Sequence, residues 1–205
     1  MSKAITRGLF VALEGPDGSG KSTLSLSMVE ELGKNHSIRT REPGGTMFSE
    51  RVRSLLLSDD ASTTSQTTLA LLFAAGRRDH VEKVILPTLE EGKHVICDRY
   101  ILATLAYQSA AERLDDIIAI GSRQLVPDIT LVVDVDYDTS VLRMGKREVE
   151  DHFEAASRAI FNLRRDVTLK YAKENPERCF IIDGCQDMAA VHDEAMKIMD
   201  RFLRR

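Results

Sequence analysis

The clearest chemistry in the chain lies in one short string between an apolar run and a stretch with helical periodicity. The string follows the pattern G-x-x-x-x-G-K-[ST], from Gly15 to Ser22. Glycines lack a Cβ, so backbone N–H groups can close around a polyphosphate at the positive end of a helix. The Lys21 ammonium can then reach the β- and γ-phosphates, and the Ser22 hydroxyl can bind Mg²⁺. The string predicts a nucleoside triphosphate site; the competing interpretation is a glycine-rich turn that only caps a helix.

An acidic and a basic residue follow a second apolar run. Asp98 and Arg99 come directly after the run Val95–Cys97. A carboxylate oxygen suits Mg²⁺, directly or through water, and a guanidinium suits a phosphate. Taken alone, the two residues would be read as a surface ion pair. Beside a phosphate loop, they predict that Ser22 and Asp98 hold the metal and that Arg99 binds a phosphate.

Three further residues could recognise a base. Phe73 and Arg77 are four residues apart and therefore share one helix face. A flat ring beside a guanidinium can stack on a base and hydrogen-bond its edge or its phosphate. Gln108 carries both a donor and an acceptor and could read a pyrimidine edge. Taken singly, the three would be a core phenylalanine, a solvated arginine and a surface glutamine.

A charged segment near the middle of the second half could act as a flap. It runs from Arg143 to His152, with Gly145 as a possible hinge beside Lys146 and Arg147. Closing such a segment, at about residues 143–154, would bring cations over a transferring phosphoryl group. A solvated helix end is the alternative interpretation.

Short apolar runs alternate with helical patterns along the chain, and this order predicts the elements that position the groups above. Such alternation is typical of an α/β fold: a three-layer, P-loop NTPase-type architecture with a five-stranded parallel sheet flanked by helices, plus a short lid. Ligands of such sheets bind at the carboxyl ends of the strands. The expected strands are 9–13, 37–41, 94–97, 129–135 and 179–182. The expected helices are about 21–34, 46–57, 67–91 with a possible kink at Pro87, stretches within 101–124, one from 139, 152–174 and 188–203.

Composition excludes several classes of protein. A length of 205 residues and 43% hydrophobic content predict one globular domain, 1–205. A formal net charge of −4 argues against a nucleic-acid binder, although 19 of the 28 basic residues are arginine, the residue of bidentate phosphate recognition. The three cysteines form no C-x-x-C pair, and no signal-peptide pattern or 18-residue apolar run occurs. We therefore expect a cytoplasmic protein that does not bind membranes.

Several strings together resemble bacterial thymidylate kinases over nearly the whole chain. They are EGPDGSGKST, TREPGGT, LLFAAGRRDHV, DRYILATLAYQ and VPDITLVVDV. TREPGGT is the most discriminating, since many unrelated activities share the phosphate loop. The resemblance implies transfer of the ATP γ-phosphoryl group to dTMP with Mg²⁺, giving dTDP for dTTP synthesis, and it implies a homodimer. The accepting phosphate oxygen is already anionic, so charge neutralisation and positioning replace a general base.

The resemblance also implies roles for individual residues. Asp17 would contact the deoxyribose 3′-hydroxyl, Tyr107 would pack under the sugar, and Phe73 would stack on thymine. The residues implied in dTMP binding are Asp17, Glu42, Pro43, Arg53, Phe73, Arg77, Arg99, Thr104, Tyr107 and Gln108. Those implied in ATP binding are Gly15, Pro16, Asp17, Gly18, Ser19, Gly20, Lys21, Ser22, Thr23, Arg143, Cys185 and Gln186. The implied catalytic residues are Lys21, Arg99, Arg147 and Asp17.

Two positions depart from the family pattern. The flap commonly reads D-R-x-E, whereas this chain has His152 in place of the arginine, so Arg147 or Lys146 must supply the cation. Ala103 replaces a usual serine and removes one hydroxyl.

Other functions remain as alternatives. Another nucleoside monophosphate kinase, acting on dUMP, dCMP or UMP, would share most of these residues. A nucleotide-dependent switch would need an N-K-x-D string, which the chain lacks. A nucleotide sensor would bind ATP without forming ADP.

Overall fold

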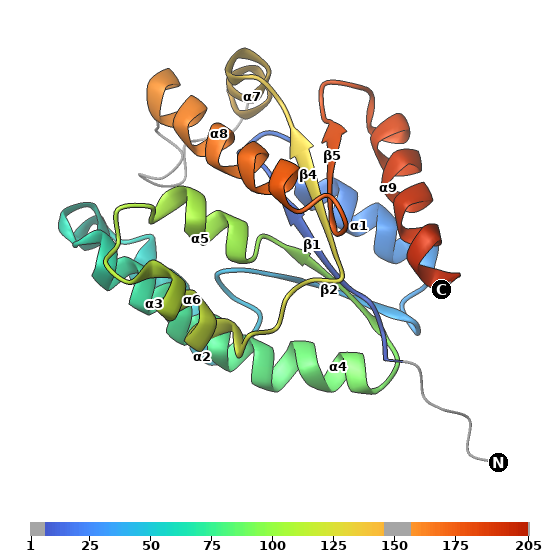
Figure 1. The fold of residues 1–205 in the computed structure, drawn as a ribbon, viewed down its shortest axis with the longest axis horizontal. Helices are drawn as coiled ribbons and strands as arrows, with labels where there is room; N and C mark the ends of the chain where they lie inside the picture. Colours follow the sequence, from blue (N-terminus) through green and yellow to red (C-terminus); the bar gives the residue numbers. More distant parts are fainter. Residues whose placement is uncertain (1–6, 146–156, 205) are drawn as a thin grey trace.

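The computed structural model describes residues 7–145 and 157–204, and a parallel β-sheet runs through their centre (Figure 1). The spatial order of its strands is β2-β3-β1-β4-β5, and every neighbouring pair is parallel. Each strand agrees within one residue at either end with its predicted range. The strands are β1 (Phe10–Glu14), β2 (Ser37–Arg41), β3 (His94–Asp98), β4 (Ile129–Asp134) and β5 (Cys179–Asp183).

Helices cover both faces of the sheet, so the predicted α/β class and three-layer architecture are confirmed. In chain order, the first helical elements are α1 (Lys21–Leu32), α2 (Met47–Leu56), η1 (Asp59–Thr63), α3 (Gln66–His80), η2 (Val81–Ile85) and α4 (Leu86–Glu90). The later ones are α5 (Ile101–Tyr107), α6 (Leu114–Ser122), α7 (Tyr137–Met144), α8 (Arg158–Glu174) and α9 (Met188–Leu203). Among the described residues, no helix combines the length and the apolar character needed to cross a membrane.

The central strand β1 is buried on both faces. Val11 and Leu13 pack in one core cluster with residues of α1 and α9. Phe10 and Ala12 pack on the opposite face with residues of η2 and α4 and with Tyr100. Because Phe10 to Leu13 are all buried in these two clusters, polar side chains of β1 that could bind a ligand must lie at the end of the strand.

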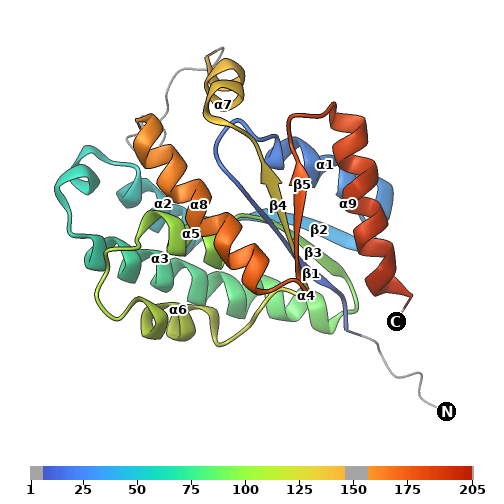
Figure 2. The ribbon, with the colours of Figure 1, turned by 45° about the horizontal axis from the view of Figure 1, so that its top comes forward.

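The chain changes direction around β1. The connection from β1 leads toward the β2 edge, whereas the connections from β3 and β4 lead toward the β5 edge. A reversal of this kind opens a crevice at the carboxyl ends of the central strands, where α/β proteins bind ligands. In Figures 1 and 2, α7 and the amino-terminal end of α8 lie at this end of the sheet.

The predicted long helix at 67–91 is present but not uniform. It is α-helical from Gln66 to His80, π-helical from Val81 to Ile85, and α-helical again to Glu90. The expected disturbance at Pro87 lies one turn earlier. A proline ring collides with the carbonyl four residues before it, here that of Lys83, and the wider π turn accommodates this residue.

Candidate functional site

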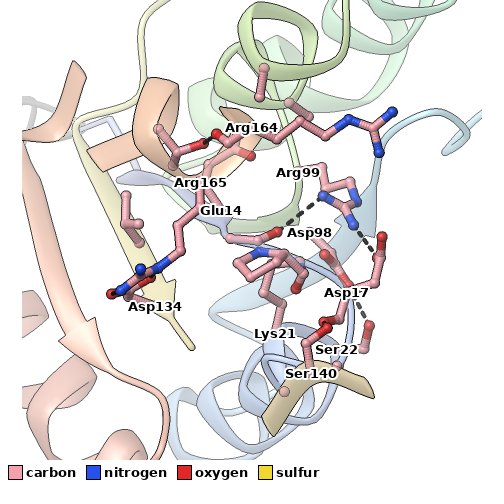
Figure 3. Close-up of a pocket in the computed structure, with 18 of the residues that line it drawn as sticks. Glu14, Asp17, Lys21, Ser22, Asp98, Arg99, Asp134, Ser140, Arg164 and Arg165 are labelled. Carbon is pink, nitrogen blue, oxygen red and sulfur yellow. Dashed lines mark hydrogen bonds and ion pairs between the residues drawn. The ribbon is translucent and has the colours of Figure 1, made fainter. Parts of the chain in front are cut away.

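A cavity lies at the carboxyl ends of β1, β3 and β4 (Figure 3). Its volume is about 750 Å³, and its walls come from the phosphate loop, from the strand-end acids Glu14, Asp98 and Asp134, and from helices α5, α7 and α8. A cavity of this size can hold a drug-sized or larger polar ligand. The crevice predicted from strand order is thus a real cavity.

The phosphate loop depends on glycine at two positions. Gly15 has φ +137°, and a Cβ there would lie 2.3 Å from the Val133 carbonyl oxygen on β4. Gly18 has φ +74°, and a Cβ there would lie 2.7 Å from the Ser140 carbonyl oxygen on α7. The loop therefore fits tightly between β4 and α7, and a side chain at either position would displace it.

Lys21 begins α1 with its ammonium group folded back over the loop. Its Nζ donates to the Pro16 carbonyl oxygen at 2.7 Å and to Ser19 Oγ at 3.2 Å. Burial lowers the pKa of Lys21 to about 8, with a further lowering from the Arg99 charge. A phosphate anion in this place would stabilise the charged ammonium and would satisfy the donors that now bond to the loop.

Ser22 and Asp98, the two residues that the sequence predicts as metal ligands, lie in contact. The Ser22 hydroxyl donates to Asp98 Oδ2 at 2.5 Å, which joins the start of α1 to the end of β3. Hydroxyl and carboxylate oxygens are hard donors of the kind that Mg²⁺ prefers, with phosphate oxygens and water completing its shell. The described residues contain no group of three or more His, Cys, Asp or Glu that could hold a metal alone. This donor set therefore fits a magnesium ion that also binds a nucleotide.

Arg99 connects the phosphate loop to α5. Its guanidinium donates to the Gly15 carbonyl oxygen at 3.2 Å and forms an ion pair with Asp17. The Tyr107 hydroxyl donates to the other Asp17 oxygen at 3.1 Å. Burial alone would raise the pKa of Asp17, but the charges of Arg99 and Lys21 outweigh it and lower that pKa to about 2. Asp17 is therefore ionised at neutral pH.

The backbone at Arg99 is unusual and has a buried support. Arg99 has φ +70°, a left-handed conformation that non-glycine residues rarely adopt. The next amide, the Tyr100 N–H, donates to Glu14 Oε1 at 2.8 Å. Burial raises the pKa of Glu14 to about 7, although the Arg99 charge opposes the rise. Glu14 lies in the cavity wall, one residue beyond the predicted strand 9–13, and sequence reasoning gave it no role.

Arg77 is buried in a dense hydrogen-bond network. Its Nε donates to Glu42 Oε2 at 2.7 Å, and one terminal nitrogen donates to the Tyr100 carbonyl oxygen and to Thr104 Oγ1, both at 2.9 Å. The other terminal nitrogen is buried without a partner among the described residues. Burial opposes ionisation of Glu42, but Arg77 and His80 outweigh it and hold the Glu42 pKa below its usual value. The interpretation of Arg77 as a solvated surface charge is wrong.

Gln108 is also buried and unpaired. Its side chain is 0% exposed, and neither Oε1 nor Nε2 has a hydrogen-bond partner within the described ranges. A carboxamide buried in this way costs about 1–3 kcal/mol unless something bonds to it. The interpretation of Gln108 as a surface glutamine is wrong, and its unmet bonding capacity is suited to a ligand edge.

Comparison with known proteins reveals the family. The model of the family "Thymidylate kinase" matches residues 13–195. A thymidylate kinase of Cupriavidus taiwanensis is 40% identical over 202 residues, which cover 94% of this chain and 98% of that protein. One of Pseudomonas entomophila is 36% identical over 205 residues, covering 97% and 98%. The chain belongs to the thymidylate kinase family.

A solved structure extends the similarity to three dimensions. The thymidylate kinase of Ehrlichia chaffeensis superposes with a TM-score of 0.74 at 34% identity, covering 95% of this chain and 99% of that one. The resemblance to thymidylate kinases seen in the sequence is therefore confirmed.

The thymidylate kinase cavity contains most of the residues expected from the sequence. Those that line it are Gly15, Pro16, Asp17, Gly18, Gly20, Lys21, Ser22, Thr23, Glu42, Arg53, Asp98, Arg99, Tyr107 and Arg143. Ser19 lies under the loop, bonded to Lys21. The expected residues outside the cavity wall are Pro43, Phe73, Arg77, Thr104, Gln108, Cys185 and Gln186.

Pro43 and Phe73 do not line the cavity, but each lies near another predicted site residue. Pro43 accepts a hydrogen bond from Arg53 at 3.2 Å. Phe73 is half-buried four residues before Arg77, packed against the cluster containing Val52 and Leu69.

At one end of the cavity, α7 meets the turn after β5. Arg143 donates to the Gly184 carbonyl oxygen at 2.8 Å. Cys185 and Gln186 are exposed in the same turn. The structure thus brings these three together, whereas Lys146, Arg147 and His152 lie outside the described residues, as does most of the expected lid.

Among the cavity-lining residues that sequence reasoning missed are four polar ones: Ser140 on α7, Arg164 and Arg165 on α8, and Asp134 at the end of β4. Ser140 donates to the Asp17 carbonyl oxygen at 2.7 Å. The Arg164 guanidinium lies 4.1 Å from the centre of the Tyr107 ring, and Arg165 forms two 2.6 Å bonds with Asp134 (Figure 3). An N-L-R-R string on a polar helix carries no signal that could have identified these arginines, because solvated arginines look the same.

Proposed function

We propose that the residues of this cavity transfer the γ-phosphoryl group of ATP to dTMP, giving ADP and dTDP. Thymidylate kinase is the enzyme predicted from the sequence, and membership in the family supports this activity. The observation that carries the residue roles is the junction of the phosphate loop with Arg99, Asp17 and Tyr107 in one cavity. This junction gives one subsite for each nucleotide, on either side of Arg99.

Two cations of the chain neutralise the phosphates in this proposal. Two unit charges 4 Å apart repel by about 4 kcal/mol at an effective dielectric near 20, so phosphates need cations to approach each other. Lys21 lies on the ATP side, and Arg99 lies between the loop and the acceptor side. Arg147, outside the described residues, would add a cation from the lid segment at about residues 143–154.

Magnesium would be held by Ser22 and Asp98, together with ATP phosphate oxygens. When bound, it would neutralise the phosphate charge that develops during transfer. Ser22 and Asp98 would hold it at the start of α1, where Lys21 would bind the phosphates of the same nucleotide.

The acceptor would lie toward α3 and α5. Phe73 would face the thymine ring, and the free nitrogen of Arg77 and the Gln108 carboxamide would bond its edge. Tyr107 would lie under the sugar, with Asp17 near its 3′-hydroxyl. Thr104 and Glu42 hold Arg77, and Arg53 and Pro43 complete the monophosphate side.

The ATP base would lie between Arg143 and the turn of Cys185 and Gln186. We treat residues 1–205 as one kinase domain. Its three cysteines are free, which suits a reducing compartment, so the cytoplasm is the proposed location.

Turnover of a nucleotide panel tests the proposed function. ADP release should be fastest with dTMP, and dUMP should lose about 10–200-fold in kcat/KM, the value of one methyl group in a fitted pocket. UMP should be poorer still, because Tyr107 disfavours a 2′-hydroxyl. EDTA in excess should abolish turnover, and Mg²⁺ should restore it. Equal rates with dUMP would indicate a different monophosphate kinase, and tight ATP binding without ADP would indicate a sensor.

A homodimer is proposed from the outer face of α2, α3 and α6. α2 packs against α3 and α3 against α6, so the three form one layer (Figures 1 and 2). Large apolar side chains on these helices point to solvent: Met47, Phe48, Leu55, Leu71 and Ile120. Apolar patches of this kind mark interaction surfaces, and a second copy is the occupant that the family resemblance implies.

Leu71→Asp should convert the dimer to a monomer. Leu71 is 54% exposed, so the change should cost the monomer little stability while burying a charge in the dimer. Light scattering should give twice the 22.9 kDa chain mass for the wild type and one chain mass for the variant. Leu203→Asp, a 43% exposed leucine on α9, should remain dimeric. A dimeric Leu71→Asp variant would place the interface elsewhere.

A further inference from the structure

We propose that His80 is a positioning residue for dTMP recognition: its ring holds Glu42 in the one orientation that presents Arg77 to the thymine edge. The inference rests on the proposed function and names a residue that would touch neither nucleotide. It would act through two successive hydrogen bonds, from His80 to Glu42 and from Arg77 to Glu42.

The His80 ring is fixed at both nitrogens. It is 0% exposed, with Nδ1 lying 3.1 Å from Glu42 Oε1 and Nε2 lying 2.7 Å from Thr40 Oγ1. An ionised carboxylate can only accept a hydrogen bond, so Nδ1 carries the hydrogen. Nε2 forms a second hydrogen bond with the Thr40 hydroxyl, so the orientation of the ring is fixed from both sides.

The loop after β2 closes over this pair of residues. Gly45 has φ +88°, and a Cβ there would lie 2.4 Å from His80 Nε2 and 2.8 Å from Thr40 Oγ1. Only a residue without a side chain fits this place. The structure therefore explains the second glycine of the TREPGGT string: Gly45 packs directly against the Thr40–His80 hydrogen bond, where no side chain would fit.

Glu42 transmits the constraint to Arg77. Its two oxygens are divided between the two partners, Oε1 to His80 and Oε2 to Arg77 Nε at 2.7 Å. Arg77 and His80 are three residues apart on α3 and face the same carboxylate. With Nε and one terminal nitrogen occupied, Arg77 has only its other terminal nitrogen left for a ligand.

Loss of the His80 donor would free the Glu42 carboxylate to rotate. Glu42 Oε1 would lose its only hydrogen bond among the described residues, and a buried carboxylate without a donor finds a new one. Besides Glu42, the charged residues near His80 are Arg77 and Asp79, both on α3. Asp79 accepts a hydrogen bond from Thr46 and forms an ion pair with Lys83, so it offers Glu42 no donor. Arg77 is the nearest donor, and a second bond to it would pull its guanidinium from the base edge.

The test compares dTMP and ATP kinetics across four variants. His80→Leu should raise the KM for dTMP about 10- to 100-fold, the cost of an unmet buried polar group, with the KM for ATP within about twofold of wild type. His80→Asn should recover part of this loss, since its amide N–H can replace Nδ1–H. Thr40→Val, which removes the hydroxyl with little change in shape, should raise the KM for dTMP by a smaller factor. His36→Leu, at an exposed histidine before β2, is the matched control and should behave as wild type.

The outcomes separate this inference from a general loss of structure. A merely structural role would raise both KM values together or lower kcat and melting temperature alone, with no recovery in the Asn variant. An unchanged KM for dTMP in His80→Leu would overturn the proposal. If that variant does not fold, a wild-type KM for dTMP in both His80→Asn and Thr40→Val would overturn it equally. Failure of the proposed function would appear in the wild-type enzyme as a lack of preference for dTMP, before any variant is made.

Discussion

Lys21→Ala should retain the fold and lose about 10²–10³-fold or more in kcat, since removal of one preorganised charge donor to a transition state costs that much. The ammonium lies over the phosphate loop, where it bonds to Pro16 and Ser19. These bonds hold it where the β- and γ-phosphates would lie. The lysine is 5% exposed and its pKa is lowered to about 8, so burial of its charge already costs the protein free energy. Its removal should therefore not destabilise the fold.

The measurement is single-turnover dTDP formation together with the free energy of unfolding. Lys34→Ala, at an exposed lysine after the same helix α1, is the control and should be fully active. A lysine that served only to cap the loop would show the reverse pattern, with lower stability and near-normal turnover. That result would remove Lys21 from the mechanism.

Gln108→Leu should separate activity from stability. The carboxamide is fully buried with both polar atoms unpaired, so leucine should leave the free energy of unfolding unchanged or raise it by up to about 1–3 kcal/mol. The same change removes the donor and acceptor proposed for the thymine edge. We expect kcat/KM for dTMP to fall by about 100-fold, because a site built for hydrogen bonds loses them without replacement.

Urea denaturation and steady-state kinetics on the same preparation provide this test. Asn162→Leu, on the exposed side of α8, controls for an added leucine and should change neither quantity. A parallel fall in stability and activity would mean that Gln108 has a structural bond elsewhere, and unchanged kcat/KM would exclude it from base recognition.

The strands and the phosphate side of the site could be predicted because their signals are local. Gly15 to Ser22 carries its chemistry in consecutive residues, and an acid at the end of an apolar strand must emerge beside it in a parallel sheet. For the same reason, all five strands agree with the predicted ranges.

The residues that sequence reasoning missed depend on distant neighbours. Glu14 follows the predicted strand 9–13 with no signal of its own, and its role becomes visible only in the bond from the Tyr100 amide, 86 residues away. Arg77 and Gln108 were recognised as candidates, yet their burial depends on segments far along the chain, as the bonds of Arg77 to Glu42 and Thr104 show. In the sequence, Arg164 and Arg165 are indistinguishable from solvated charges. In the structure, α8 lies beside the cavity and both arginines line it. Spacing within one element can be read locally, whereas burial is a property of the whole chain.

The π turn η2 divides one continuous helix between two tasks. On its amino-terminal side, α3 presents Arg77 and His80 to Glu42; from Val81 onward, Ile85 and Leu89 lie in the core beneath the sheet. An α-helix rotates by about 100° with each residue, so one residue more or fewer in this segment would turn one half against the other. The number of residues in η2 thus sets the rotation of the site residues on α3 relative to the core residues that follow. A single-residue deletion within 81–85 would remove none of the proposed site residues, yet it would rotate Arg77 and His80 relative to the core. In this segment the number of residues is therefore as strictly constrained as their types.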